Sequence, residues 1–155
     1  MKKIEKEKKL IGAGGTRVVY DLGNGYVIKI AKSRKGILCN KMEVSLYKSS
    51  AKHIKKYLAP IKDYDKAYRW VTMKKYIGKF PSNSSIYNRK LMKLVQRFLD
   101  NHIIPSTGIS RYHNPYAPNL RLKQSKQIVV IDYGGFKYAK NHNRKRSKII
   151  GSGAR

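Results

Sequence analysis

Cysteine is almost absent from this sequence, in which Cys39 is the single example among 155 residues. One thiol cannot form an internal disulfide, and it cannot build a zinc site of the multi-cysteine type. The sequence therefore excludes a disulfide-stabilised secreted scaffold and a cysteine-rich zinc domain.

Long apolar runs are absent too. No segment approaches the roughly 18 apolar residues of a membrane-spanning helix, and the charged N-terminal stretch MKKIEKEKKLIG is not followed by the apolar core of a signal peptide. These absences predict a soluble, cytoplasmic protein with no membrane partner. The hydrophobic fraction of 41% and the 12 tyrosines indicate a chain that folds, as one domain or as two small lobes sharing a core.

Acidic residues are also scarce in this sequence. Eight Asp and Glu stand against 36 Lys and Arg, which gives a formal net charge of +28. Such an excess attracts nucleic acid, nucleotides or acidic proteins. Lysine outnumbers arginine, however, and Lys, Asn, Ile and Tyr are abundant together, a bias that an AT-rich genome produces without selection for binding. Nucleic acid is therefore one of the partners to consider, and each of the few acids is informative.

The stretch from Asn119 to Gly135, NLRLKQSKQIVVIDYGG, predicts a short β-hairpin with oxygen-bearing side chains at its open end. Leucines alternate with polar residues in its first half, and a β-branched run stops at Asp132 in its second half. Asn119 enters the first strand and Asp132 leaves the second, so we expect the two to lie side by side. An amide oxygen and a carboxylate suit Mg²⁺, which keeps the rest of its shell for water and phosphate. The alternative is a plain hairpin whose aspartate only caps its end.

A glycine-rich loop precedes a second predicted hairpin. Gly12, Gly14, Gly15 and Thr16 supply backbone amides and a hydroxyl that can approach a phosphate closely, although a plain flexible turn has the same composition. The hairpin joins strands at 17–21 and 26–32 through an Asn-Gly turn.

Lys29 lies in the second of these strands, on the same side as the small apolar residues Val27 and Ala31. An inward ammonium is costly unless it is paired. The next acid along the chain is Glu43, in a segment that we predict to be a helix with Asn40 as its N-cap. A Lys29–Glu43 pair would hold the ammonium ready for phosphate oxygens, whereas in the alternative Lys29 extends to solvent from an edge strand.

The strongest helical pattern spans Ser85 to Asp100, where leucines, a valine and a phenylalanine fall on one face. Its basic residues form either a solvated face or a track for nucleic acid. Past Phe136 we expect only a basic tail, which is either an electrostatic arm or a frayed terminus.

Several of these features resemble, in their order along the chain, the signatures of the protein-kinase-like superfamily. They cover roughly residues 10–136: Gly12-x-Gly14 with Val19-Tyr20, Val27-Ile28-Lys29, Glu43, Asn119 and Asp132-Tyr133-Gly134. The resemblance implies an α+β, two-lobed fold. An antiparallel sheet plus a helix would form the N-lobe at 1–78, a truncated helical C-lobe would follow at 79–136, and a basic tail would occupy 137–155.

The resemblance also implies a site for ATP and Mg²⁺. Lys29, paired with Glu43, would contact the nucleotide phosphates. Asn119 and Asp132 would hold the metal ion. The resemblance implies that the glycine loop covers the phosphates with Gly12, Gly14, Gly15 and Thr16. It implies that Val19 and Val27 lie over the adenine, and that a hinge from Met73 to Tyr76 contacts the adenine edge.

The sequence departs from the family pattern at three places. Arg17 stands where a third loop glycine is usual, and a phosphate contact is one role for it. Asn114 stands where the family carries its catalytic aspartate, and an amide cannot accept a proton as a carboxylate does; His113 is the candidate substitute. Too few residues follow Gly134 for an activation segment and a substrate platform, which is typical of small phage or bacterial kinase-like proteins.

Two hypotheses follow from these observations. In the first, the protein is a minimal phosphotransferase that binds ATP and Mg²⁺ and acts on Ser/Thr of a protein, in the host cytoplasm if it is phage-encoded, with impaired base chemistry. Its catalytic residues would be Lys29, Glu43, Asn114, Asn119 and Asp132. In the second, it is a pseudokinase whose basic surface binds nucleic acid or an acidic partner protein.

Overall fold

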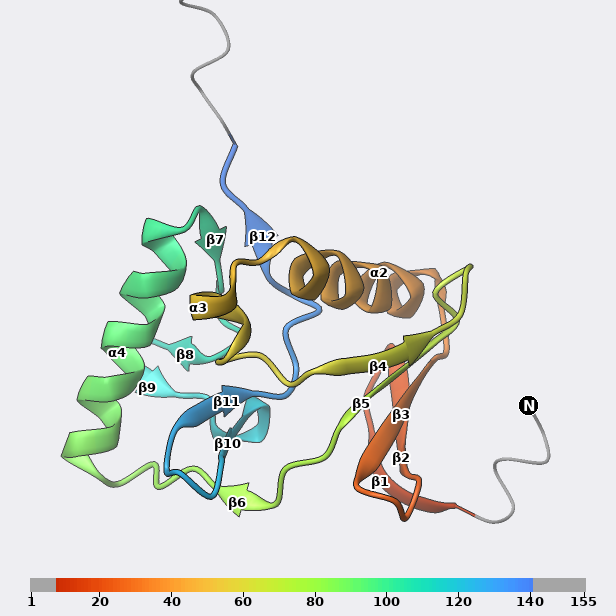
Figure 1. Ribbon diagram of the computed structural model, residues 1–155, viewed down its shortest axis with the longest axis horizontal. Helices are drawn as coiled ribbons and strands as arrows, with labels where there is room; N and C mark the ends of the chain where they lie inside the picture. The colour runs from red at the N-terminus through yellow and green to blue at the C-terminus, as the bar shows by residue number, and fades with distance from the viewer. Residues whose placement is uncertain (1–7, 141–155) are drawn as a thin grey trace, which may run out of the picture.

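The computed structural model describes residues 8–140. Within that range the fold is mixed α+β, with a five-stranded antiparallel sheet, three α-helices and several short strand pairs (Figure 1). The strand order of the large sheet is β1-β2-β3-β5-β4: β1 is Lys9–Ala13, β2 Arg17–Asp21, β3 Tyr26–Ala31, β4 Ile61–Tyr64 and β5 Trp70–Lys74. No helix among these residues is long and apolar enough to cross a membrane.

The β2–β3 hairpin forms as predicted. Gly23 and Gly25 adopt φ angles of 74° and 84°, a conformation that glycine reaches without a Cβ clash. The strands pair with Val19 opposite Lys29. Because Arg17 is two residues before Val19, Arg17 and Lys29 project from the same face of the sheet.

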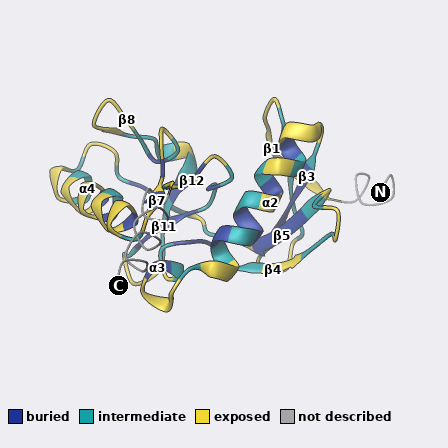
Figure 2. Ribbon diagram, turned by 90° about the horizontal axis from the view of Figure 1, so that it is seen from above, coloured by how far each residue is buried: buried dark blue, intermediate teal, exposed yellow. Residues whose placement is uncertain are grey.

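Helix α2 (Arg34–Ser49) packs against the large sheet (Figure 2). It begins at the N-cap Ser33, whose side chain accepts a backbone hydrogen bond from the first turn. The prediction of Asn40 as N-cap is therefore wrong, since Asn40 lies in the middle of α2 and is buried. Its amide is satisfied inside the protein, because Nδ2 donates to the Tyr68 carbonyl and Oδ1 accepts from Arg17.

A second group of elements surrounds α4, which spans Ser85–Asp100 as predicted and buries Leu91, Leu94 and Phe98. The short elements of this group are α3 (Lys52–Lys55), η1 (Ala117–Asn119) and three antiparallel ladders: β6 (Gly78–Lys79) with β10 (Leu120–Leu122) and β11 (Ile128–Val130), β7 (Ile103–Ile104) with β12 (Lys137–Tyr138), and β8 (Ser110–Arg111) with β9 (Asn114–Pro115). The β10–β11 pair is the hairpin predicted between Asn119 and Asp132.

One hydrophobic core runs through both groups of elements. Val27 and Met73 of the large sheet, Leu46 of α2, Phe98 of α4 and Val130 of β11 belong to the same cluster of buried side chains. Figure 2 shows the large sheet and α2 on one side of the molecule and α4 with the short ladders on the other. Because apolar burial stabilises by about 25 cal/mol per Å², this shared core holds the two sides together.

The chain after Phe136 differs from the expected basic tail. Most of the predicted tail at 137–155, like residues 1–7, lies outside the described residues. Lys137–Tyr138, however, form β12 and pair with β7 rather than starting a tail. The reason is that Phe136 is buried and packs edge-to-face on Phe98 at 5.4 Å, which anchors the chain beside α4.

Candidate functional site

A cleft of about 670 Å³ opens between the large sheet and the short β6–β10–β11 sheet. This size is ordinary for a small-molecule site. Predicted site residues from both sides of the molecule line it: Gly12, Val19, Val27, Lys29, Met73 and Tyr76 from one side and Asn119 and Asp132 from the other. Residues that are far apart in the sequence are therefore brought together around one cavity.

Lys29, on β3, is held in this cleft by two acceptors. Its Nζ donates to Glu43 Oε1 at 2.8 Å and to the Ile131 carbonyl at 2.7 Å. The ion pair predicted from the sequence is present, and the alternative of a solvent-extended Lys29 is wrong, since Lys29 is only 4% exposed. An ammonium has three N–H donors, so one remains for a ligand oxygen.

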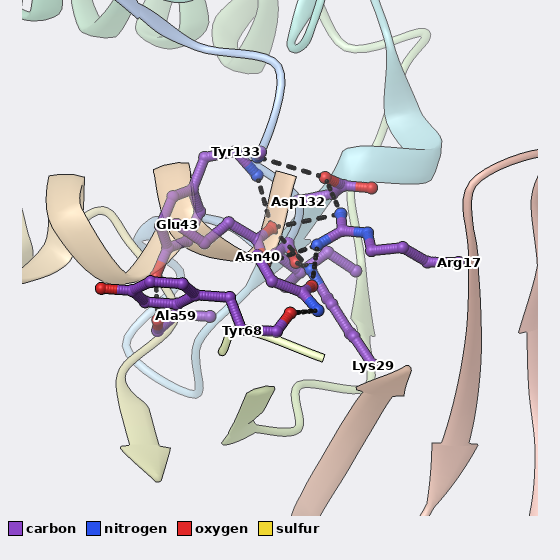
Figure 3. A network of polar contacts seen from close by, with 10 residues as sticks. Arg17, Lys29, Asn40, Glu43, Ala59, Tyr68, Asp132 and Tyr133 are labelled. Atoms are coloured by element: carbon purple, nitrogen blue, oxygen red, sulfur yellow. Dashed lines mark hydrogen bonds and ion pairs between the residues drawn. The ribbon is translucent and has the colours of Figure 1, made fainter. Parts of the chain in front are cut away.

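Arg17 joins the two carboxylates of the site (Figure 3). Its Nη1 donates to Glu43 Oε2 at 2.8 Å and to Asn40 Oδ1 at 3.0 Å. Its Nη2 donates to Asp132 Oδ1 at 2.8 Å. The guanidinium, considered from the sequence as a phosphate contact, is buried and binds protein oxygens instead.

These ion pairs shift the pKa of the Arg17 guanidinium and the pKa of the Asp132 carboxyl group. Burial lowers the pKa of Arg17, but the carboxylates of Glu43 and Asp132 outweigh burial and raise it above its ordinary value. Burial raises the pKa of Asp132, but the charges of Lys29 and Arg17 outweigh burial and lower it below its ordinary value. Asp132 is therefore an ionised carboxylate at neutral pH, as a metal ligand must be.

Asp132 and Asn119 offer two oxygen atoms to the cleft. The backbone N–H of Ile131 donates to the Asn119 carbonyl at 2.9 Å, which places the two segments side by side, as predicted. Asn119 Nδ2 donates to the Gly108 carbonyl at 2.7 Å, so Oδ1 is the side-chain atom left for a ligand. Arg17 takes Oδ1 of Asp132, whose side chain is 42% exposed, and this leaves Oδ2.

This donor set fits a cation that arrives with its own ligand. Within residues 8–140 no group of three or more His, Cys, Asp or Glu side chains could hold a metal ion. A hard cation bound by one carboxylate and one amide oxygen must complete its shell with water and ligand oxygens. Mg²⁺ bound to a phosphate-bearing molecule has that preference.

Two glycines bring α2 close to both walls of the site. A Cβ on Gly36 would lie 2.2 Å from the Thr16 carbonyl oxygen, and one on Gly134 would lie 2.9 Å from Cys39 Cβ. Only a hydrogen fits at either place. This close approach sets the position of Glu43, on α2, relative to the loop before β2 and the segment after β11.

The outer part of the glycine loop does not line the cleft. Gly12 does, whereas Gly14, Gly15 and Thr16 do not. The Gly14 N–H donates to the Arg17 carbonyl at 2.9 Å, so this amide is used within the loop. The phosphate contacts expected of these three residues stay a prediction.

Asn114 also lies outside the cleft lining. It is exposed on β9, opposite Arg111, in a hairpin whose turn residues Tyr112 and His113 have φ angles of 50° and 64°. Two successive positive φ angles are typical of a tight two-residue hairpin turn. Neither Asn114, expected at the base position, nor its candidate substitute His113 is part of the described cleft lining that contains Asp132, and both are exposed.

Sequence reasoning missed the part that Arg17 and Asn40 play. A signal for Arg17 was present, because the Asn-Gly turn sets the hairpin register and puts Arg17 on the face of Lys29. Two cations on one buried face require more than one acid. Glu43 and Asp132 together meet that requirement.

No model of a known protein family matches the chain, and no curated protein matches it either. Any function must therefore be inferred from the cleft, which Lys29 and Asp132 line, and from the ion pairs that Arg17 and Glu43 make with them.

Proposed function

We propose that the cleft binds ATP with Mg²⁺ and that the protein is a minimal phosphotransferase of the protein-kinase-like type, acting on Ser/Thr of a protein. The observation that carries this proposal is the convergence of Lys29, Asn119 and Asp132 on one cleft of about 670 Å³. An ammonium fixed by a buried acid, beside a carboxylate and an amide oxygen, suits a triphosphate with its metal ion.

The arrangement of the elements supports a kinase-like, two-lobed fold. The large sheet and α2 lie on one side, and α4 and the short ladders lie on the other (Figure 2). Residues from both sides line the cleft. In this proposal the chain up to residue 78 is the N-lobe, and residues 79–136 are a minimal C-lobe.

The chain's own residues divide the work of binding between them. Val19, Val27 and Met73 present apolar surface to the base. Lys29, oriented by Glu43, donates its remaining N–H to a phosphate oxygen. Asn119 Oδ1 and Asp132 Oδ2 would hold Mg²⁺, which neutralises charge on the phosphates when it is bound.

The acceptor hydroxyl has no dedicated carboxylate base. Among the described residues that line the cleft, Asp132 is the only acid, and its proposed role is to bind metal. Absence of a general base costs about 10²- to 10⁴-fold in rate. Positioning and electrostatic stabilisation supply most of the acceleration of phosphoryl transfer. We therefore expect slow turnover rather than none.

The test of this proposal compares ATP affinity, measured by calorimetry with and without Mg²⁺, in the wild type and two variants. Lys29→Met should weaken ATP binding about tenfold or more, because a charge-assisted hydrogen bond is lost. Asp132→Asn should remove the dependence of ATP binding on Mg²⁺. Asp63→Asn, which changes an exposed acid on β4, is the matched control and should bind as the wild type does. Unchanged Mg²⁺-dependent affinity in Asp132→Asn would overturn the proposal.

A second candidate function is that of a pseudokinase serving as a basic binding module for nucleic acid or an acidic partner protein. The exposure of Asn114 outside the cleft favours it, as does the net charge of +28. Incubation with labelled ATP, Mg²⁺ and protein acceptors separates the two candidates, since label transfer that Lys29→Met abolishes rejects the pure binding module. A salt titration of binding to random RNA or DNA tests the nucleic-acid part, because phosphate contacts produce a steep dependence on salt.

A further inference from the structure

Asp132 has only one oxygen free for a metal ion, because Arg17 Nη2 binds its Oδ1 at 2.8 Å. Two divalent ions that share one carboxylate commonly bind one of its oxygens each, and Oδ1 of Asp132 also accepts from the Gly134 backbone N–H at 3.4 Å. Protein kinases with two Mg²⁺ ions hold them with such an aspartate and a nearby asparagine. In this protein the guanidinium already occupies one of the two positions (Figure 3).

The charges of the four side chains joined by ion pairs balance before any metal ion binds. Glu43 and Asp132 supply two negative charges, and Lys29 and Arg17 supply two positive charges within hydrogen-bonding distance of them. A second divalent ion would have only the nucleotide phosphates to offset its charge, because Asp132 is the only acid in the described cleft lining, and the other basic residues of that lining would already face the phosphates: Lys74, Lys75, Lys79 and Arg121. Unbalanced charge in a partly buried site is costly.

Arg17 is held too firmly to leave when a metal ion approaches. Glu43 accepts from it at 2.8 and 3.4 Å, and Asn40 accepts at 3.0 Å. The residue is 7% exposed, so movement of the guanidinium would strand a buried charge. Its planar fork reaches three side chains at once, which a lysine ammonium on a single stem does not do in the same fixed geometry.

We propose that Arg17 takes the place of a second metal ion, so that the cleft binds ATP with a single Mg²⁺. The inference rests on the proposed function. Arg17 is a positioning residue here: it orients Asp132 so that Oδ2 faces the ligand, and it supplies the fixed positive charge that a second ion would otherwise bring. Because Arg17 directly follows the glycine loop, it also ties that loop to Asp132.

The first experiment counts metal ions in the wild-type protein. Mn²⁺ is titrated into protein held in excess over a non-hydrolysable ATP analogue, and bound Mn²⁺ is measured by electron paramagnetic resonance. The expected result is one ion for each bound nucleotide. Two ions would overturn the inference while leaving the proposed function in place. No nucleotide binding at all would overturn the proposed function, and the inference with it.

The second experiment tests whether Arg17 is the reason for a single ion. Arg17→Met frees Oδ1 of Asp132 and removes a positive charge, so a second Mn²⁺ should bind. Without metal, affinity for the nucleotide should fall about tenfold, because one fixed positive charge near the phosphates is lost. Arg69→Met removes an arginine from an exposed ion pair with Asp65 and is the matched control, which should keep one ion.

Arg17→Lys is a second test variant, which is needed if the protein does not fold without a cation at this position. It keeps the positive charge but cannot span both carboxylates, so its second Mn²⁺ should bind more weakly than in Arg17→Met and more tightly than in the wild type. Circular dichroism establishes which variants are folded. One ion in every folded Arg17 variant would show that Arg17 does not set the metal count and would reject the inference.

Discussion

At the scale of single residues, Glu43 organises the site. It is fully buried, and its oxygens accept hydrogen bonds from Lys29, Arg17 and the backbone N–H of Tyr133. A buried carboxylate is stable only where such donors replace its lost water. One side chain on α2 therefore orients both cations and the segment that carries Asp132.

Tyr133, next to Asp132, offers a test of how this segment is held. Its buried hydroxyl donates to the Ala59 carbonyl at 2.8 Å, and burial raises its pKa well above the ordinary value, so it stays protonated. Tyr133→Phe should lower the free energy of unfolding by about 1–2 kcal/mol, because a buried acceptor loses its donor. Urea unfolding measures the change.

The matched control for that variant is Tyr138→Phe. Tyr138 shares a hydrogen bond with Ser49 Oγ at 2.9 Å, but it is exposed, so water replaces the lost partner. The free energy of unfolding should change by no more than about 0.5 kcal/mol. Equal losses in the two variants would contradict the role assigned to the buried hydroxyl of Tyr133.

At the scale of elements, α2 is the part that assembles the site. It presents Asn40 and Glu43, three residues apart on one helical face, to Arg17. Close approach at Gly36 and at Gly134 sets its distance from the loop before β2 and from the segment after β11. The site geometry therefore depends on how closely these elements pack, as well as on the charged side chains themselves.

Adjacent glycines after Asp132 allow this packing to be tested. A Cβ at Gly134 would lie 2.9 Å from Cys39 Cβ and 3.0 Å from its carbonyl oxygen, whereas a Cβ at Gly135 would meet nothing within 4 Å. Gly134→Ala should destabilise by about 1–3 kcal/mol through overpacking, and it should weaken the proposed ATP binding because Asp132 moves relative to Glu43.

Gly135→Ala is the control, and it should be neutral or slightly stabilising, because alanine has less freedom than glycine in the unfolded chain. Thermal unfolding and nucleotide titration of the two variants provide the comparison. A Gly134→Ala variant as stable as Gly135→Ala would show that α2 can shift without cost.

At the scale of the whole molecule, positive charge far exceeds negative charge, with 36 Lys and Arg against 8 Asp and Glu. Within residues 8–140, the basic residues in ion pairs are Arg17, Lys29, Arg69 and Lys75. At the cleft, Lys79 and Arg121 lie directly opposite each other in the β6–β10 pair. Like charges in that position repel.

This repulsion predicts that salt stabilises the protein. The screening length falls from about 30 Å at 0.01 M to about 3 Å at 1 M ionic strength, so the melting temperature should rise with sodium chloride, as self-repulsion in a protein of net charge +28 is reduced. Choline chloride should act equally, because only ionic strength matters. A melting temperature that falls with salt would show that exposed ion pairs outweigh the repulsion.

Much of the local structure could be predicted from the sequence. The β2–β3 and β10–β11 hairpins, helix α4 and the Lys29–Glu43 ion pair all follow from patterns within short windows: turn residues, a helical stripe, and an inward lysine followed by one acid. Such patterns act through neighbours along the chain or along one strand, so they are readable before the fold is known.

The sequence by itself therefore determined the local elements, the scarcity of acids and the residue types from which phosphate and metal contacts are proposed. Tertiary structure alone decided that Arg17 bridges Glu43 and Asp132, that Asn40 is buried within α2, and that Asn114 lies outside the cleft. The reason is distance along the chain: 115 residues separate Arg17 from Asp132, and a buried ion pair of that span exists only after the surrounding elements have packed.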